Sequence, residues 1–107
     1  MPGFLANHDA LKGKGIDTIA CISVNDAFVM GAWAKNQGTD GKVMMLGDGN
    51  GEFTEKMGLT LDASRNGLGK RSQRYAMMVE DGVIKQLHVE APSAFEVSSA
   101  ESVLKGL

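Results

Sequence analysis

The sequence predicts a three-layer α/β domain with a mixed sheet, and three observations support this. Short apolar runs rich in β-branched residues alternate with amphipathic helical patterns, an Asp-Gly pair separates two later apolar runs, and no linker or internal repeat divides the chain. Because 107 residues build one hydrophobic core, we expect a single domain over residues 1–107.

The N-terminal half predicts a parallel β-α-β unit preceded by a helix. Residues 4–12 place apolar side chains at helical spacing, so a helix is expected there from the chain's first residues. Residues 16–24 form an almost continuous apolar run, typical of a strand buried on both faces. Asn25 is expected to cap a helix that ends at Gly38, and residues 42–46 predict a second buried strand. The crossover between the two strands should be right-handed.

The middle of the chain is less regular. The glycine-rich turn at residues 47–51 predicts a bend into a short helix over residues 52–57, and the polar segment 61–70 predicts a surface loop.

The last part predicts a hairpin and a helix. Residues 74–79 and 83–89 flank the sequence Glu-Asp-Gly, which is typical of an antiparallel hairpin. Ser98 and Glu101 have capping-box spacing before a final apolar helical pattern.

Most large apolar side chains are expected in the core, although Phe28 and Trp33 are equally explained as part of a dimer face. The helix after residue 25 has apolar residues on one face, and the predicted strands hold four methionines that would fill gaps between layers. These residues are Phe28, Val29, Ala32, Trp33, Met44, Met45, Met77 and Met78.

The composition excludes several function classes. Hydrophobic residues make up 43% of the chain and charged residues 22%, and 11 basic against 13 acidic residues give a net charge of -2, which argues against nucleic acid as a partner. No apolar run reaches the roughly 18 to 20 residues that span a bilayer, so no membrane partner is expected.

Neither a metal nor a cofactor is predicted. The glycine-rich turn lacks the Lys-Ser/Thr ending of a phosphate loop, and Leu59 stands where a calcium loop starting at Asp48 needs a bidentate Glu. A small-ligand site at this turn is the weakest of the functional hypotheses. His8 and His88 are single histidines without neighbouring ligands at metal spacing, so structural or solvated roles are expected for both.

Two side chains are candidates for chemistry. Cys21, the only cysteine, lies near the end of a predicted parallel strand, where open α/β sheets gather their sites; it is either a small buried hydrophobe or a reactive thiol. Arg74 closes a polar run from Lys70 and immediately precedes a strand, whereas its neighbours are expected to be solvated. A planar cation there would stabilise a thiolate or an oxyanion.

Three segments carry a resemblance that covers the chain from end to end. They are residues 1–4 (MPGF), residues 21–33 (CISVNDAFVMGAW) and residues 74–82 (RYAMMVEDG). The chain resembles the type II, atypical two-cysteine (peroxiredoxin-five-like) peroxiredoxins, which are thiol peroxidases with a thioredoxin-like fold. The resemblance implies that Arg74 polarises the peroxide and stabilises the reacting thiolate. It leaves Cys21 either a resolving cysteine or a bystander.

The same resemblance points to a departure. The family's Pro-x-x-x-Thr-x-x-Cys motif, with the peroxidatic cysteine, is absent from the sequence. We therefore expect a truncated domain that lacks the N-terminal strands, is inactive alone, and has unpaired strand edges between the segments 16–24 and 74–80.

The resemblance also implies substrates and partners. Hydrogen peroxide and alkyl hydroperoxides would be the substrates, a glutaredoxin or thioredoxin the reductant, and a homodimer the assembly. A single cysteine fits a reducing compartment, so a cytoplasmic location is expected. The alternative is a non-catalytic thioredoxin-like module for dimerisation or regulation.

Overall fold

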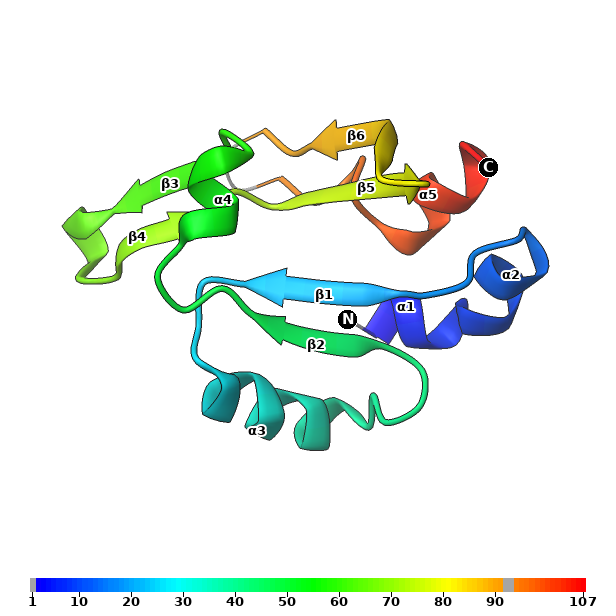
Figure 1. Ribbon diagram of the computed structural model, residues 1–107, viewed down its shortest axis with the longest axis horizontal. Helices are drawn as coiled ribbons and strands as arrows, with labels where there is room; N and C mark the ends of the chain where they lie inside the picture. The colour runs from blue at the N-terminus through cyan, green and yellow to red at the C-terminus, as the bar shows by residue number, and fades with distance from the viewer. Residues whose placement is uncertain (1, 92–93) are drawn as a thin grey trace.

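The computed structural model describes residues 2–91 and 94–107 and contains a parallel β-α-β unit, drawn in the lower half of Figure 1. This unit consists of β1 (Ala20–Ser23), α3 (Ala27–Gln37) and β2 (Met44–Gly47), with Cys21 paired to Met45. The predicted parallel unit is confirmed. Met1, the first residue of the segment 1–4, lies outside the described residues.

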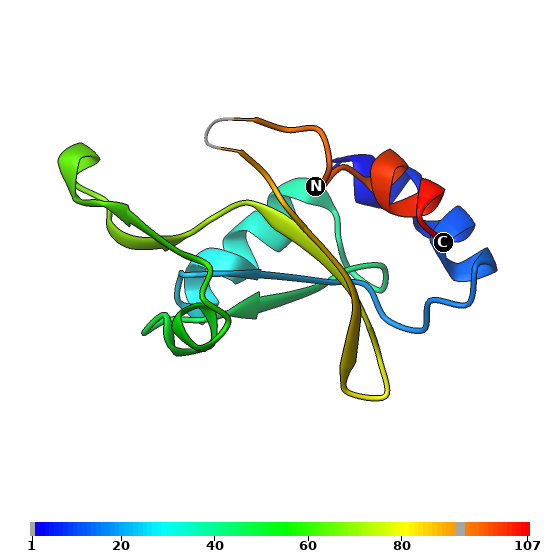
Figure 2. The ribbon, with the colours of Figure 1, turned by 90° about the horizontal axis from the view of Figure 1, so that it is seen from above.

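The predicted N-terminal helix is two helices, α1 (Pro2–Ala6) and α2 (His8–Gly13). The break falls at Asn7, where the Gly3 carbonyl accepts from the Asn7 backbone amide over 3.0 Å and from its side-chain Nδ2 over 2.8 Å. α1 packs beside α5 (Ala100–Lys105), from the opposite end of the chain (Figure 2). Ser99, not Ser98, caps α5 by accepting from the Ser102 amide.

The helix α3 begins one residue later than predicted. Its cap is Asp26, whose Oδ1 accepts from the Val29 amide over 2.8 Å, and it ends at Gly38 in the left-handed conformation. β1 is also shorter than predicted and only partly buried, and among the described strands it has a neighbour on one edge alone.

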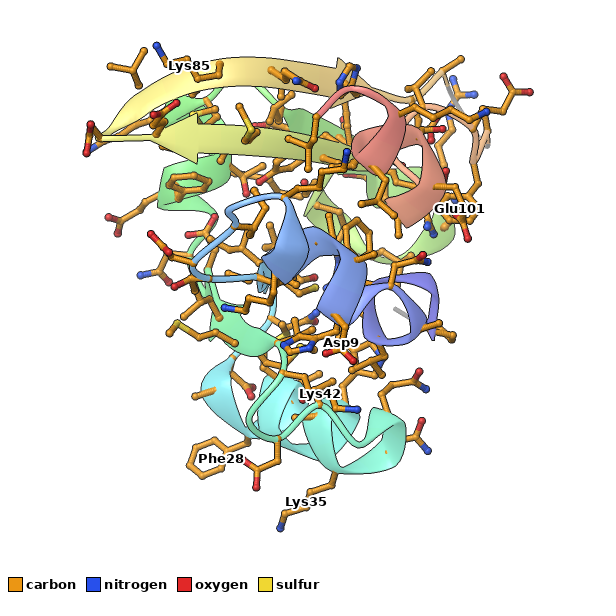
Figure 3. All side chains as sticks on the ribbon, turned by 90° about the vertical axis from the view of Figure 1, so that its right-hand side faces the viewer. Asp9, Phe28, Lys35, Lys42, Lys85 and Glu101 are labelled. Atoms are coloured by element: carbon orange, nitrogen blue, oxygen red, sulfur yellow. The ribbon has the colours of Figure 1, made fainter. Side chains whose placement is uncertain are left out.

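The apolar face of α3 differs from the prediction. Met30 is 1% exposed, whereas Phe28 is 89% exposed and points away from the rest of the molecule (Figure 3). Residues two positions apart in a helix point in directions that differ by about 200° around the axis, so the side chain of Phe28 points outward when that of Met30 is buried. Of the two interpretations of Phe28, core packing is therefore wrong, and the expected core positions of Val29 and Met44 are also wrong, because these residues are 47% and 54% exposed.

The glycine-rich turn at residues 47–51 has a structural role at the start of the helix that follows it. The Asp48 carboxylate accepts from the Thr54 amide over 2.9 Å, from its hydroxyl over 2.8 Å and from the Phe53 amide over 3.2 Å, which caps α4 (Glu52–Lys56). The hydrogen bond from the Thr54 backbone, above all, lowers the pKa of Asp48. The carboxylate is thus already occupied, which argues against a ligand at this turn.

The turn also packs against the start of α3. A Cβ atom at Gly47 would lie 2.7 Å from the Asn25 carbonyl oxygen, whereas one at Gly49 would lie 4.0 Å from it. We expect Gly47→Ala to lower the free energy of unfolding by about 1–3 kcal/mol, because the two backbone segments must separate. Urea denaturation of both alanine variants tests this, and an equal loss in Gly49→Ala would contradict it.

The predicted loop 61–70 is wrong. It forms the hairpin of β3 (Thr60–Ala63) and β4 (Gly69–Ser72), joined through the 3₁₀ turn η1 (Ser64–Asn66), with Thr60 opposite Ser72. This hairpin extends away from the other strands (Figure 2), and Ala63 is the one apolar residue that its strands bury, so no alternating pattern in the sequence reveals them.

The Asp-Gly hairpin is confirmed as β5 (Tyr75–Glu80) and β6 (Val83–Val89). Asp81 and Gly82 both have positive φ, at 51° and 78°, as a tight two-residue hairpin turn requires.

The described strands pair in three separate two-stranded sheets rather than one continuous sheet. β1 and β5 each keep one unpaired edge as a result, which agrees with the expectation for the segments 16–24 and 74–80. The buried apolar residues of the described part are few: Leu11, Met30, Val43, Leu59, Ala63 and Ala100. None of its helices has the length and apolar character needed to cross a membrane.

Candidate functional site

Arg74 lies just before β5, at the junction with the β3–β4 hairpin. Its carbonyl accepts from the Glu90 amide over 2.9 Å, which fixes its backbone beside the end of β6. Its side chain is exposed, and the guanidinium carbon lies 4.9 Å from the centre of the Phe95 ring. Such a cation–π contact contributes about 0.5–1 kcal/mol at an exposed site.

The Arg74 side chain lines a cavity of about 540 Å³. Part of its wall is apolar and part carries polar groups: the lining residues are Leu61, Ser72, Gln73, Arg74, Glu90, Ala91, Ala94 and Phe95. Within residues 2–91 and 94–107, the Arg74 guanidinium makes no side-chain hydrogen bond. Its donors therefore remain available to an oxygen atom that carries or develops negative charge.

Glu90 is 8% exposed and is held by the segment that follows it. Its Oε2 accepts from the Glu96 amide over 2.7 Å, the Ser98 amide over 2.8 Å and the Ser98 hydroxyl over 2.7 Å, and its Oε1 accepts from the Val97 amide over 3.2 Å. Desolvation raises the pKa of this carboxyl, but the hydrogen bonds from Ser98, Glu96 and Val97 outweigh it and lower the pKa to about 2. Glu90 is therefore a carboxylate at neutral pH.

Arg71 connects the β3–β4 hairpin to the β-α-β unit. One of its terminal nitrogens donates to the Val24 carbonyl over 2.9 Å and to Asn25 Oδ1 over 3.1 Å, and its Nε donates to the Leu68 carbonyl. The prediction that Arg71 is simply solvated is wrong, because it is half-buried against the turn between β1 and α3.

Cys21 lies in β1 and is half-buried. Burial raises the pKa of its thiol, so at neutral pH the thiol is mostly protonated and is a weak nucleophile. It does not line the Arg74 cavity. The structure therefore does not bring the two sequence-predicted site residues together at that cavity.

The two histidines contact near neighbours. His8 Nδ1 lies 3.1 Å from Asp9 Oδ1, and His88 Nε2 lies 3.1 Å from Gln86 Oε1. The described part of the chain holds no group of three or more His, Cys, Asp or Glu side chains arranged to bind a metal ion.

Sequence reasoning found Arg74 but missed the residues around it. Phe95 and Glu90 come 21 and 16 positions later than Arg74, in a segment without periodicity, and Arg71 stands in a charged run. No periodic pattern distinguishes these three residues, since Arg71 and Phe95 have partners far along the chain and Glu90 has its partners in an irregular segment six to eight residues later.

A parallel β-α-β unit beside an antiparallel hairpin is the arrangement of a thioredoxin-like α/β protein, and the described residues add an arginine without a side-chain hydrogen-bonding partner on the wall of a partly apolar cavity. The model of the redoxin family matches residues 1–104. The chain belongs to this family and is peroxiredoxin-like, as the sequence resemblance predicted.

Named relatives agree with this assignment. Peroxiredoxin-2E from Arabidopsis thaliana, a chloroplastic protein, is 56% identical over all of this chain and 47% of its own length. Peroxiredoxin-2B from the same plant is 45% identical over all of this chain and 66% of its own length. Reduced Prx3 from Vibrio vulnificus, solved in complex with hydrogen peroxide, is 51% identical, with a TM-score of 0.94 over 99% of this chain and 68% of that one.

These matches confirm the predicted fold class, a thioredoxin-like α/β protein. The chain spans about half the length of the first curated relatives it matches.

Proposed function

We propose that the protein containing these residues is a thiol-dependent peroxidase that reduces hydrogen peroxide and alkyl hydroperoxides. The observation that carries the proposal is the Arg74 guanidinium, which has no hydrogen-bonding partner in the described residues and faces a half-apolar cavity. The hydrogen peroxide complex of the Vibrio relative supports it. In this role Arg74 stabilises negative charge on the reacting oxygen atoms and on the attacking sulfur.

The reaction needs two thiols. A thiolate attacks one peroxide oxygen, an S–O bond forms, the O–O bond breaks, and the second oxygen leaves with a proton as water or an alcohol. The resulting sulfenic acid condenses with another thiol, which releases water and forms a disulfide. An external dithiol then reduces that disulfide and is itself oxidised.

We assign Cys21 the resolving role rather than the attacking one. Its raised pKa and its absence from the cavity lining both disfavour attack on peroxide. In the second step the Cys21 sulfur attacks the sulfenic sulfur, and the thiol proton leaves with the sulfenic oxygen as water. The attacking thiolate would then be supplied by residues other than these 107. The alternative for Cys21 is a bystander.

The partners follow from the same chemistry. A thioredoxin or glutaredoxin is proposed as the reductant, and a homodimer through the α3 face that bears Phe28 as the assembly, since that ring is 89% exposed. The cytoplasmic location stays a prediction, because the names of the relatives include chloroplastic and mitochondrial proteins.

A chimaera tests the function. The 107 residues of this chain would replace the 107 matched residues of Peroxiredoxin-2B, so that the rest of that protein completes the molecule. We expect the folded chimaera to consume hydrogen peroxide with a thioredoxin system, and the 107-residue chain alone, with or without Cys21→Ser, to show no turnover.

Each arm of this experiment has a contrary outcome. A folded but inactive chimaera would contradict the proposal and favour the non-catalytic module. Turnover by the chain alone that Cys21→Ser abolishes would make Cys21 the attacking thiol. Mass spectrometry of the chimaera after one equivalent of peroxide should find Cys21 in a disulfide, and a free Cys21 thiol would make it a bystander.

A further inference from the structure

The Glu90 carboxylate organises the segment that holds the Arg74 side chain. Its four hydrogen bonds gather the amides of residues 96–98 around one point, at the end of β6. Phe95 immediately precedes the first of these amides, so the placement of its ring depends on the gathered segment. At the same point, the Glu90 amide donates to the Arg74 carbonyl.

These contacts form a continuous series from the Glu90 carboxylate to the Arg74 guanidinium. The Phe95 ring lies under the Arg74 guanidinium at 4.9 Å, and all three residues line the same cavity. The described part of the chain contains no ion pair between Glu90 and Arg74, because the amides and the Ser98 hydroxyl already occupy the carboxylate oxygens. Such an ion pair would consume the donors that an oxygen atom of a substrate needs.

We propose that Glu90 is a positioning residue for Arg74, acting through the segment 96–98 and the Phe95 ring. Glu90 holds the ring beneath the guanidinium and, because its own oxygens are occupied, leaves the guanidinium free to face the cavity. This inference rests on the role proposed above for Arg74, but it concerns the orientation of the side chain and is measured without turnover.

Nuclear magnetic resonance of the ¹⁵N-labelled 107-residue chain tests the proposal. Protons above an aromatic ring are shifted upfield, so the Arg74 side-chain signals should lie upfield in the wild type and lose that shift in Phe95→Leu. We expect Glu90→Gln to lose the shift as well, because its amide group places N–H donors where the backbone amides need an acceptor. The signals of Arg65 and Arg71 serve as internal references.

Glu96→Gln is the matched control. It removes one carboxylate from the same segment, but the Glu96 side chain is exposed and only its backbone amide contacts Glu90, so the Arg74 shift should persist. If Glu90→Gln fails to fold, Ser98→Ala tests the proposal in its place. It removes one of the four hydrogen-bond donors to Glu90 and should partly reduce the upfield shift of the Arg74 signals. The proposal would be overturned if the Phe95-dependent shift were unchanged in Glu90→Gln, or in Ser98→Ala where that variant is used. The absence of such a shift in the wild type would also overturn it.

Discussion

Replacing Arg74 with methionine in the chimaera is expected to lower kcat/KM for hydrogen peroxide by about 10²–10³-fold, the usual cost of removing one preorganised donor to a developing negative charge. The structure gives the reason, since the guanidinium is the one cationic group on the wall of the described cavity. Steady-state peroxide consumption measures the effect. Arg74→Lys should retain part of the activity, because it keeps the charge but loses the planar pair of donors.

Arg65→Met provides the control for this prediction. Arg65 is an exposed arginine in η1 and does not line the cavity, so its replacement should leave kcat/KM unchanged. An equal loss in both variants would mean that net charge, not the position of Arg74, determines the rate. An active Arg74→Met chimaera would contradict the role assigned to Arg74.

Met30→Ala is expected to lower the free energy of unfolding of the chain by about 2–5 kcal/mol, the range for removing a large buried side chain and leaving a cavity. Met30 is 1% exposed and is the buried residue by which α3 is anchored. The few buried apolar residues of the described part leave little to compensate for the loss. Urea denaturation followed by circular dichroism measures it.

Phe28→Ala is the matched comparison. Phe28 lies on the same helix but is 89% exposed in the single chain, so for the monomer at low protein concentration its replacement should change the free energy of unfolding by no more than about 0.5 kcal/mol. A loss that grows with protein concentration is what the proposed homodimer through this face would add, and a large loss in the monomer would contradict the exposed position of Phe28.

The sequence was informative wherever the determining contacts are local. The β5–β6 hairpin follows from Asp81 and Gly82, since two residues of positive φ fix the turn and therefore the register. The bounds of the helix α3 are likewise set by its N-terminal cap and by Gly38, and the predicted start was one residue too early.

The β3–β4 hairpin shows where this reasoning fails. Its strands combine polar residues with the exposed Leu61 and the buried Ala63, without alternation, so no period-2 pattern marks them. Phe28 illustrates the same limit, because helical spacing predicts which residues share a face but not which face the sheet covers.

The sequence by itself determined the order of most elements, the redox family and Arg74 as the residue of interest, because caps, turns and motifs are read from neighbouring residues. Only the tertiary structure decided what surrounds Arg74: the Phe95 ring beneath it, the Glu90 carboxylate that gathers the segment after β6, and the half-buried state of Cys21. These depend on contacts outside regular secondary structure, whose geometry is set by packing and by the hydrogen bonds that buried polar groups must find.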